Sequence, residues 1–248
     1  MDRLAALTEK IRANGGDADF RHLDVTGLES VRAYVTAAHK RHGRVDVLGN
    51  NAGVMQLSTL DKLRVDDWNR MIDVNLRGTL HGIAAVLPLM GETGGHIVNV
   101  ASTSGLRVDP TAAVYCATNF GVRARSEGLR QENTNLRVTI VSPGFTHSEL
   151  ADQGGDPETQ VAARAASEQL GIPASAVADA IAYAVSQPAA VDVNEIVVRP
   201  TAQTEPARTR SARRVLSCQP SARRVPSRHR NRRRAECGAA ERIRESGQ

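Results

Sequence analysis

The chain has 248 residues, of which 41% are hydrophobic and 24% charged, so it can bury the core of one α/β domain. No run approaches the ~18 consecutive apolar residues of a membrane span, which excludes a transmembrane helix. The formal net charge of +5 is unevenly spread, because residues 202–248 hold 13 Arg and 4 Glu while residues 1–201 hold 19 basic and 23 acidic side chains.

The first 50 residues predict two helices and two strands. Apolar residues recur at helical spacing from residue 4 to residue 11, and Gly15-Gly16 ends this helix. Residues 19–23 and 45–48 are short apolar runs that favour strands. Between them, Thr26 followed three residues later by Glu29 predicts a capping box that opens a helix running to about residue 42.

The chain up to residue 201 continues this alternation of helix and strand. The patterns predict a long helix over 65–90, with Pro88 near its end, and another over 111–133. They also predict three strands, at 96–100, 138–141 and 195–198. A polar, helix-prone insertion is expected over 148–170 and a further helix over 174–187. Short apolar strands separated by helices predict an α/β, Rossmann-like doubly wound parallel sheet.

The composition changes abruptly after Gln203. The motif SARRV occurs at 211–215 and again at 221–225, and an Arg cluster follows at 228–234. A segment with so few apolar residues cannot bury a core, so we expect a folded domain over 1–203 and a disordered Arg-rich tail over 204–248. Arginine clusters can neutralise phosphates, but nucleic-acid binding is the less favoured interpretation of this tail.

The cysteines and histidines show no spacing typical of a metal site. The N-terminus is charged and lacks the apolar segment of a signal peptide. These two observations predict a reduced cytoplasmic protein that holds no metal and no structural disulfide.

Unusual polar residues follow the predicted strands: Asp24, Asn50-Asn51, Ser102 and Ser142-Pro143-Gly144. In open parallel sheets, ligands bind beyond the carboxyl ends of the strands. Tyr115 opens the helix after Ser102, so both side chains can face one cleft. A phenol can donate a proton to an alkoxide, and a serine hydroxyl can hydrogen-bond the same oxygen. Taken singly, Ser102 is better interpreted as a strand-end cap and Tyr115 as a buried helix tyrosine.

Asn51-Ala52-Gly53, Asn75, Ser102, Tyr115 and Pro143-Gly144, in this order and on these elements, resemble the short-chain dehydrogenase/reductase family over residues 1–203. The resemblance implies an NAD(P)-dependent oxidoreductase that interconverts a small-molecule alcohol and a carbonyl by hydride transfer. In it, Tyr115 is the acid/base, Ser102 is the oxyanion partner and Asn75 belongs to the proton relay. From the chemistry alone, Asn75 could equally be a polar residue satisfied inside a helix.

The resemblance also implies which residues contact NAD or NADP, and where the chain assembles. The cofactor-binding positions are Asp24, Val25, Asn51, Ala52, Gly53, Tyr115, Asn119, Pro143, Gly144 and Ser148. A homo-oligomer is expected through the helices 65–90 and 111–133.

Two departures from the family pattern bear on activity. Asn119 stands where the family has a lysine, four residues after the tyrosine, so the charge that lowers the pKa of the tyrosine is absent. No GxxxGxG or GxGxxG pattern precedes residue 50, so we expect the first β-α-β unit to be lacking and cofactor binding to be weakened. Two interpretations stay open: an impaired oxidoreductase, or an inactive family remnant that keeps only the fold or the dimer surface.

Overall fold

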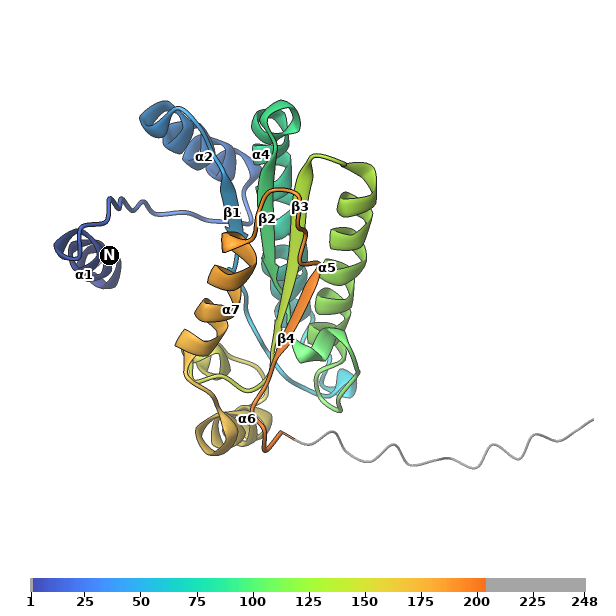
Figure 1. The fold of residues 1–248 in the computed structure, drawn as a ribbon. Helices are drawn as coiled ribbons and strands as arrows, with labels where there is room; N and C mark the ends of the chain where they lie inside the picture. Colours follow the sequence, from blue (N-terminus) through green and yellow to red (C-terminus); the bar gives the residue numbers. More distant parts are fainter. Residues whose placement is uncertain (1, 204–248) are drawn as a thin grey trace, which may run out of the picture. The chain divides into compact units, whose positions relative to one another are not determined.

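The computed structural model describes residues 2–203, and the tail predicted to be disordered, 204–248, lies outside the described residues. The main elements in chain order are α1 (Asp2–Ala13), α2 (Leu28–His42), β1 (Val47–Asn50), α3 (Val65–Met71), α4 (Gly78–Thr93), β2 (Gly95–Val100), α5 (Ala113–Glu132), β3 (Leu136–Pro143), α6 (Pro157–Leu170), α7 (Ala174–Ser186) and β4 (Glu195–Val198). Figure 1 shows them along the chain.

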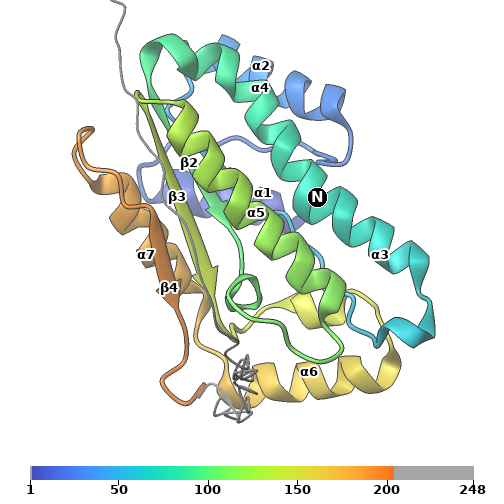
Figure 2. The same cartoon turned by 90° about the vertical axis from the view of Figure 1, so that its right-hand side faces the viewer.

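The strands form one parallel sheet in the order β1-β2-β3-β4. Val47 pairs with His96, and Ile97 pairs with Val138. Helices cover both faces, with α4 and α5 on one side and α7 on the other (Figure 2). The predicted α/β fold with a doubly wound parallel sheet is therefore confirmed.

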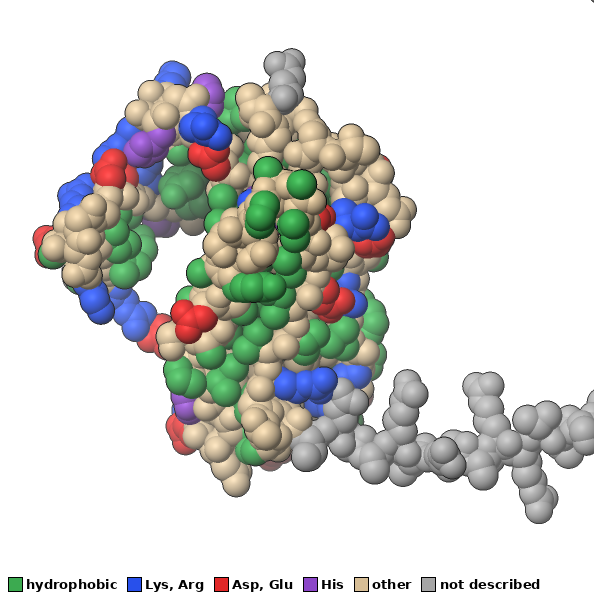
Figure 3. Space-filling model, in the orientation of Figure 1, with side chains coloured by type: hydrophobic (Ala, Val, Ile, Leu, Met, Phe, Trp, Pro, Cys, Tyr) green, Lys and Arg blue, Asp and Glu red, His purple; other side chains and the backbone are tan. Residues whose placement is uncertain are grey.

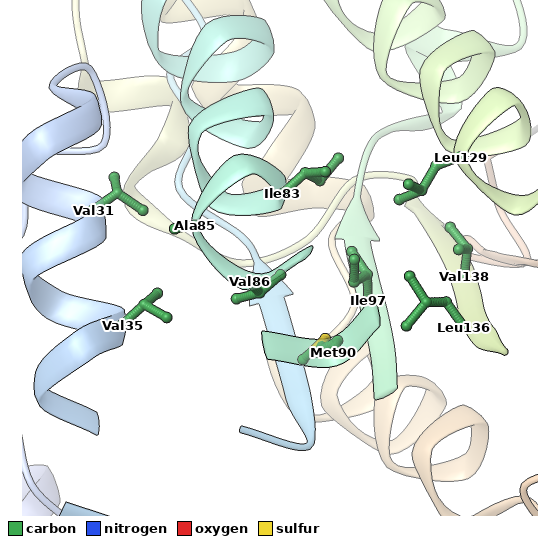
Figure 4. Packing of buried hydrophobic residues seen from close by; sticks show 10 residues of the cluster. All are labelled: Val31, Val35, Ile83, Ala85, Val86, Met90, Ile97, Leu129, Leu136 and Val138. Atoms are coloured by element: carbon green, nitrogen blue, oxygen red, sulfur yellow. The ribbon is translucent and has the colours of Figure 1, made fainter. Parts of the chain in front are cut away.

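The core on the α4–α5 face arises from the alternation of side chains along each strand. Ile97 of β2 and Leu136 and Val138 of β3 point to this face, where Leu129 of α5 meets them. Figure 4 shows the cluster, whose buried members are Val31, Val35, Ile83, Ala85, Val86, Met90, Ile97, Leu129, Leu136 and Val138. This packing fixes α2, α4 and α5 against the sheet.

The alternate residues of β2 and β3 face α7 instead, and several are polar. Arg137 donates from Nη1 to the carbonyl of Gln187 at 2.9 Å and from Nη2 to that of Val185 at 3.2 Å, which satisfies carbonyls at the end of α7. Hydrophobic side chains gather over α7 on the surface (Figure 3), where Tyr183 is 58% exposed.

His96, also on this face, is 1% exposed and carries a defined tautomer. Its Nε2 lies 2.8 Å from the hydroxyl of Thr139, and that hydroxyl donates to the carbonyl of Val193 at 2.7 Å. Because the Thr139 proton is used in this way, Nε2 of His96 carries the hydrogen and Nδ1 is the bare nitrogen. Nδ1 has no partner among the described residues. Burial is the main cause that lowers the pKa of His96 to about 4, and the charge of Arg137 lowers it further.

The predicted strand at 19–23 is wrong, because the segment is extended but joins no ladder. A parallel strand needs a neighbour to hydrogen-bond, and β1 pairs with β2 alone among the described strands. Ion pairs hold the segment instead: Arg41 of α2 contacts Asp17 at 3.1 Å and Asp19 at 2.7 Å.

The predicted capping box at Thr26 is also wrong. The residue before α2 is Gly27, which makes no side-chain cap. The Thr26 hydroxyl donates to Asp24 Oδ1 at 2.8 Å, and the Thr26 N–H donates to the same oxygen at 2.9 Å. Thr26 therefore belongs to an Asx turn, a local alternative to helix capping that Asp side chains favour.

The predicted helix over 65–90 is continuous but not uniform. A π-helical segment, Ile72–Arg77, joins α3 to α4, which runs on past Pro88 to Thr93. Single π turns inside α-helices commonly occur at functional sites, and this one contains Asn75. The predicted helix over 111–133 begins at Ala113, because Thr111 adopts a left-handed φ of 67°.

The remaining boundaries differ from prediction by a few residues. The strand predicted at 45–48 is β1 at Val47–Asn50, and that predicted at 138–141 is the longer β3. The insertion 148–170 contains a 3-10 turn at Glu149–Asp152 and then α6. β4 lies at the predicted 195–198.

We predict that acid destabilises the protein through His96. Its pKa is about 4 when folded and about 6.5 when unfolded, so the unfolded state binds the extra proton. The stability that comes from burying His96 in its neutral form is fully present above pH 6.5 and is lost as the pH falls towards 4. Between pH 7 and pH 4.5 the free energy of unfolding should fall by about 2–3 kcal/mol for this reason. Urea unfolding at both pH values should show a smaller loss for His96→Gln; an equal loss would contradict the assignment.

Candidate active site

A cavity of about 660 Å³ opens at the carboxyl ends of β1, β2 and β3. Most of the residues predicted from the sequence line it: Asn51, Ala52, Gly53, Asn75, Ser102, Tyr115, Asn119, Pro143, Gly144 and Ser148. They come from segments that are far apart in the chain and meet because parallel strands end at one edge of the sheet.

A second cavity of about 250 Å³ lies between α2, β1 and α4. It shares Asn51 and Ala52 with the first, and predicted Val25 lines it. Predicted Asp24 lines neither cavity. Its carboxylate accepts hydrogen bonds from the backbone and hydroxyl of Thr26, which lower the pKa of Asp24.

Ser102 and Tyr115 are placed by two different local structures. Ser102 follows β2 and caps the 3-10 turn Thr103–Gly105, because its Oγ accepts the Ser104 N–H at 3.1 Å. Tyr115 stands in the first turn of α5 and is 8% exposed. The side chains of Ser102 and Asn119 lie beside the phenol, and both act to lower its pKa.

Burial raises the pKa of Tyr115 above its ordinary value of 10. Hydrogen bonds to Ser102 and Asn119 oppose that rise only in part, and no cation contributes. Asn119 is itself buried, and its Nδ2 donates to the carbonyl of Tyr115 at 2.9 Å, one turn back along α5. Tyr115 is therefore a neutral phenol at pH 7 and can act as a proton donor.

Asn75 is buried and its side-chain amide is fully engaged. Oδ1 accepts the N–H of Val54 at 2.8 Å, while Nδ2 donates to the carbonyl of Val54 at 2.9 Å and to the hydroxyl of Thr118 at 3.3 Å. The amide thus pairs with a residue of the turn after β1 just as a neighbouring strand would. Asn75 positions this turn against α5.

The loop after β3 is closed by the chain that follows β4. A Cβ on Gly144 would overlap the side chains of Gln203 and Arg199, so only glycine fits there. Gln203 Oε1 accepts the N–H of Phe145 at 3.0 Å. Ser148 caps a 3-10 turn, with its Oγ accepting the N–H of Leu150 at 3.3 Å.

Several lining residues were not predicted from the sequence. Met55 follows the turn 51–53 after β1, and Val177 and Ile181 come from α7. Their apolar side chains carry no chemical signal in the sequence. Arg107 and Asp109 also line the cavity, and their place between Ser102 and Tyr115 could have identified them.

Among residues 2–203, no group of three or more His, Cys, Asp or Glu is arranged to hold a metal ion. None of the helices in that range has the length and apolarity needed to cross a membrane.

We predict that Asn75→Leu lowers the free energy of unfolding by about 2–4 kcal/mol, because it leaves both backbone groups of Val54 without their partner. Urea unfolding measures this loss. Asn133→Ala is the matched control. The Asn133 side chain donates one hydrogen bond, to the carbonyl of Leu129 at the half-buried end of α5, and its loss should cost about 1 kcal/mol or less. Equal losses would show that the Val54 pairing has no special weight.

The chain is similar in sequence to known oxidoreductases. The chain is 43% identical over 210 residues to an uncharacterized oxidoreductase of Staphylococcus saprophyticus, covering 82% of this chain and 84% of the relative. It is 40% identical over 208 residues to an uncharacterized oxidoreductase of Listeria monocytogenes, with the same two coverages.

Solved structures of dehydrogenases are also similar to this chain. An alcohol dehydrogenase from the archaeon Thermococcus sibiricus, complexed with 5-hydroxy-NADP, matches with a TM-score of 0.73 and 26% identity, over 83% of this chain and 84% of that one. A short-chain dehydrogenase/reductase from Burkholderia phymatum, in complex with NAD, matches with a TM-score of 0.71 and 26% identity, over 78% and 75%. The family model for short chain dehydrogenases matches residues 1–158, and the chain belongs to this family of oxidoreductases.

Proposed function

We propose that the chain interconverts an alcohol and a carbonyl compound, with NAD or NADP as hydride carrier and the cytoplasm as its location. The observation that carries the proposal is the shared cavity of Ser102 and Tyr115, which the turn 51–53 and the loop at Pro143-Gly144 also line. A proton donor and a second hydroxyl beside one cavity are what an alkoxide oxygen requires.

The shape of the site fits a dinucleotide. The two cavities meet at Asn51 and Ala52, so one elongated ligand can occupy both. We assign the nicotinamide half to the larger cavity, beside Tyr115, Asn119, Pro143-Gly144 and Ser148, and the adenosine half to the smaller one, beside Val25. Asp24 lines neither cavity, and we assign it to the adenosine side because it adjoins Val25 in the chain. When bound, the nicotinamide accepts or donates the hydride.

The residues of the chain handle the proton. In alcohol oxidation, the hydroxyl proton passes to the oxygen of Tyr115 while the C–H bond breaks and its electron pair leaves as hydride. In carbonyl reduction, Tyr115 donates the proton as the new C–H bond forms. Ser102 Oγ hydrogen-bonds the same substrate oxygen in both directions. Asn75 serves this reaction by holding the turn 51–54 in place.

Asn119 makes the two directions unequal. Oxidation needs an ionised Tyr115 as base, and the pKa of this phenol is raised with no cation to lower it. Reduction needs only the neutral phenol.

We predict that alcohol oxidation rises with pH through pH 10, and that Asn119→Lys moves the midpoint of this profile down by about 1–3 pH units. The initial rate of NAD(P)H formation from a panel of secondary alcohols measures it, after direct titration with NADH and NADPH has established binding. Gln131→Lys adds the same charge at the exposed end of α5 and should leave the profile unchanged.

Three outcomes would count against the scheme. Turnover that survives Tyr115→Phe would remove Tyr115 from the acid/base role. A wild-type profile with its midpoint near pH 7 would show that Asn119 is no handicap. Cofactor binding without turnover in any variant would favour the inactive remnant instead.

We further propose that copies of this chain assemble through α3–α4 and α5. Exposed apolar side chains on these helices support this: Val65, Ile72, Leu80 and Phe120 are 49%, 38%, 44% and 41% exposed. Apolar residues of this size on packed helices favour contact with another copy over contact with water.

We predict that Leu80→Asp with Phe120→Asp converts the assembly to monomers, because a charge cannot be buried unpaired in an apolar interface. Light scattering coupled to size-exclusion chromatography measures the mass. Tyr183→Asp, on α7 and 58% exposed, is the control that should not alter it. A monomeric wild type would refute the proposed surface.

A further inference from the structure

One ion pair lies on the segment that joins Ser102 to Tyr115. Arg107 and Asp109 are the only charged residues between them in the sequence, and both side chains line the larger cavity. They stand at its mouth, with side chains 28% and 34% exposed. The pair and the phenol of Tyr115 therefore line the same cavity.

Arg107 keeps unused hydrogen-bonding capacity. Its Nε donates to Asp109 Oδ2 at 3.3 Å, a long bond that steadies the guanidinium from one side. Within residues 2–203, the terminal nitrogens Nη1 and Nη2 have no hydrogen-bond partner. Two parallel N–H donors at this spacing match the two oxygens of a carboxylate.

Arg107 is the only positively charged side chain among the described residues that line the larger cavity. Among the described lining residues, the remaining charged side chains are Asp109 and Glu149. Glu149 is paired with Arg3, which donates to its two oxygens at 2.7 and 2.5 Å. Beyond these groups, α7 contributes apolar lining through Val177 and Ile181.

The segment that carries Arg107 is fixed at both ends. The N–H of Gly105 donates to the carbonyl of Ser102 at 2.8 Å, which closes the 3-10 turn. At the other end, the N–H of Ser58 donates to the carbonyl of Thr111 at 2.9 Å. The fold therefore holds the backbone of the segment that carries Arg107 in place between Ser102 and Tyr115.

We propose that Arg107 binds a carboxylate of the substrate, so that this site takes hydroxy or oxo carboxylic acids with a small apolar body. The inference rests on the proposed function for its reacting oxygen, and it adds the substrate class. Asp109 acts as a positioning residue, because it touches Arg107 and orients its free edge towards the cavity.

The test is binding, which does not require turnover. Straight-chain 2-, 3- and 4-hydroxy acids of three to eight carbons, and the neutral amide of each, are titrated calorimetrically into the full chain with and without NADH or NADPH. We expect at least one acid to bind 10-fold or more tightly than its amide, and Arg107→Gln to abolish that difference. Arg107→Lys should restore part of it, because an ammonium keeps the charge but loses the paired donors.

Matched variants separate recognition from stability. Arg130→Gln removes an exposed charge of α5 that is paired with Glu127 and should leave the preference for acids intact. Asp109→Asn keeps an acceptor for Nε and removes the opposing charge, so acids should bind as well or better. If every acid and its amide bind alike, or if the preference survives Arg107→Gln, the proposal is wrong. If Asp109→Asn weakens binding as much as Arg107→Gln, the pair is structural and the proposal is likewise overturned.

The outcome is independent of cofactor binding. A chain that prefers acids but binds neither NADH nor NADPH would refute the proposed oxidoreduction while keeping the role of Arg107. A chain that binds cofactor and shows no preference for acids would do the reverse.

Discussion

The side-chain amide of Asn75 holds together the three parts of the site. It pairs with both backbone groups of Val54, which fixes the turn after β1, and it donates to the Thr118 hydroxyl. Thr118 in turn donates to the carbonyl of Tyr115 at 2.8 Å. A π-helical segment, Ile72–Arg77, presents this amide from inside the continuous helix. The positions of the turn, the helix and the phenol therefore depend on one another.

A series of side-chain hydrogen bonds aligns the strands that carry the site. Asn50 Nδ2 donates to Asn99 Oδ1 at 2.9 Å, and Asn99 Nδ2 donates to the Ser126 hydroxyl at 2.9 Å. The Ser126 hydroxyl completes the series by donating to the carbonyl of Val122 at 2.7 Å. Buried polar groups are costly unless they are paired. This series of hydrogen bonds therefore favours the observed register of β1 against β2, and the observed position of α5, over other arrangements. That register places the strand ends at one edge.

The chemistry of the site follows from what surrounds Tyr115. Burial favours its neutral form, and the Asn119 amide is turned back onto the helix backbone. The phenol is thereby suited to giving a proton and poorly suited to taking one. Arg107, which lines the same cavity, is not among the groups that shift the pKa of Tyr115.

The sequence by itself determined the fold class and the order of most elements, because apolar periodicity and polar strand ends are local signals. The strand end at Ser102 and the helix start at Tyr115 could be assigned to one cleft from the sequence pattern, whereas Asn75, Asn119 and the cofactor-binding positions followed from the family resemblance. Only the tertiary structure decided that residues 19–23 form no strand, since a ladder needs a neighbouring strand, and that Thr26 serves an Asx turn. It also decided that the Asn75 amide pairs with the backbone of Val54. These contacts join residues distant in the chain or depend on side-chain direction, and neither is written in local sequence.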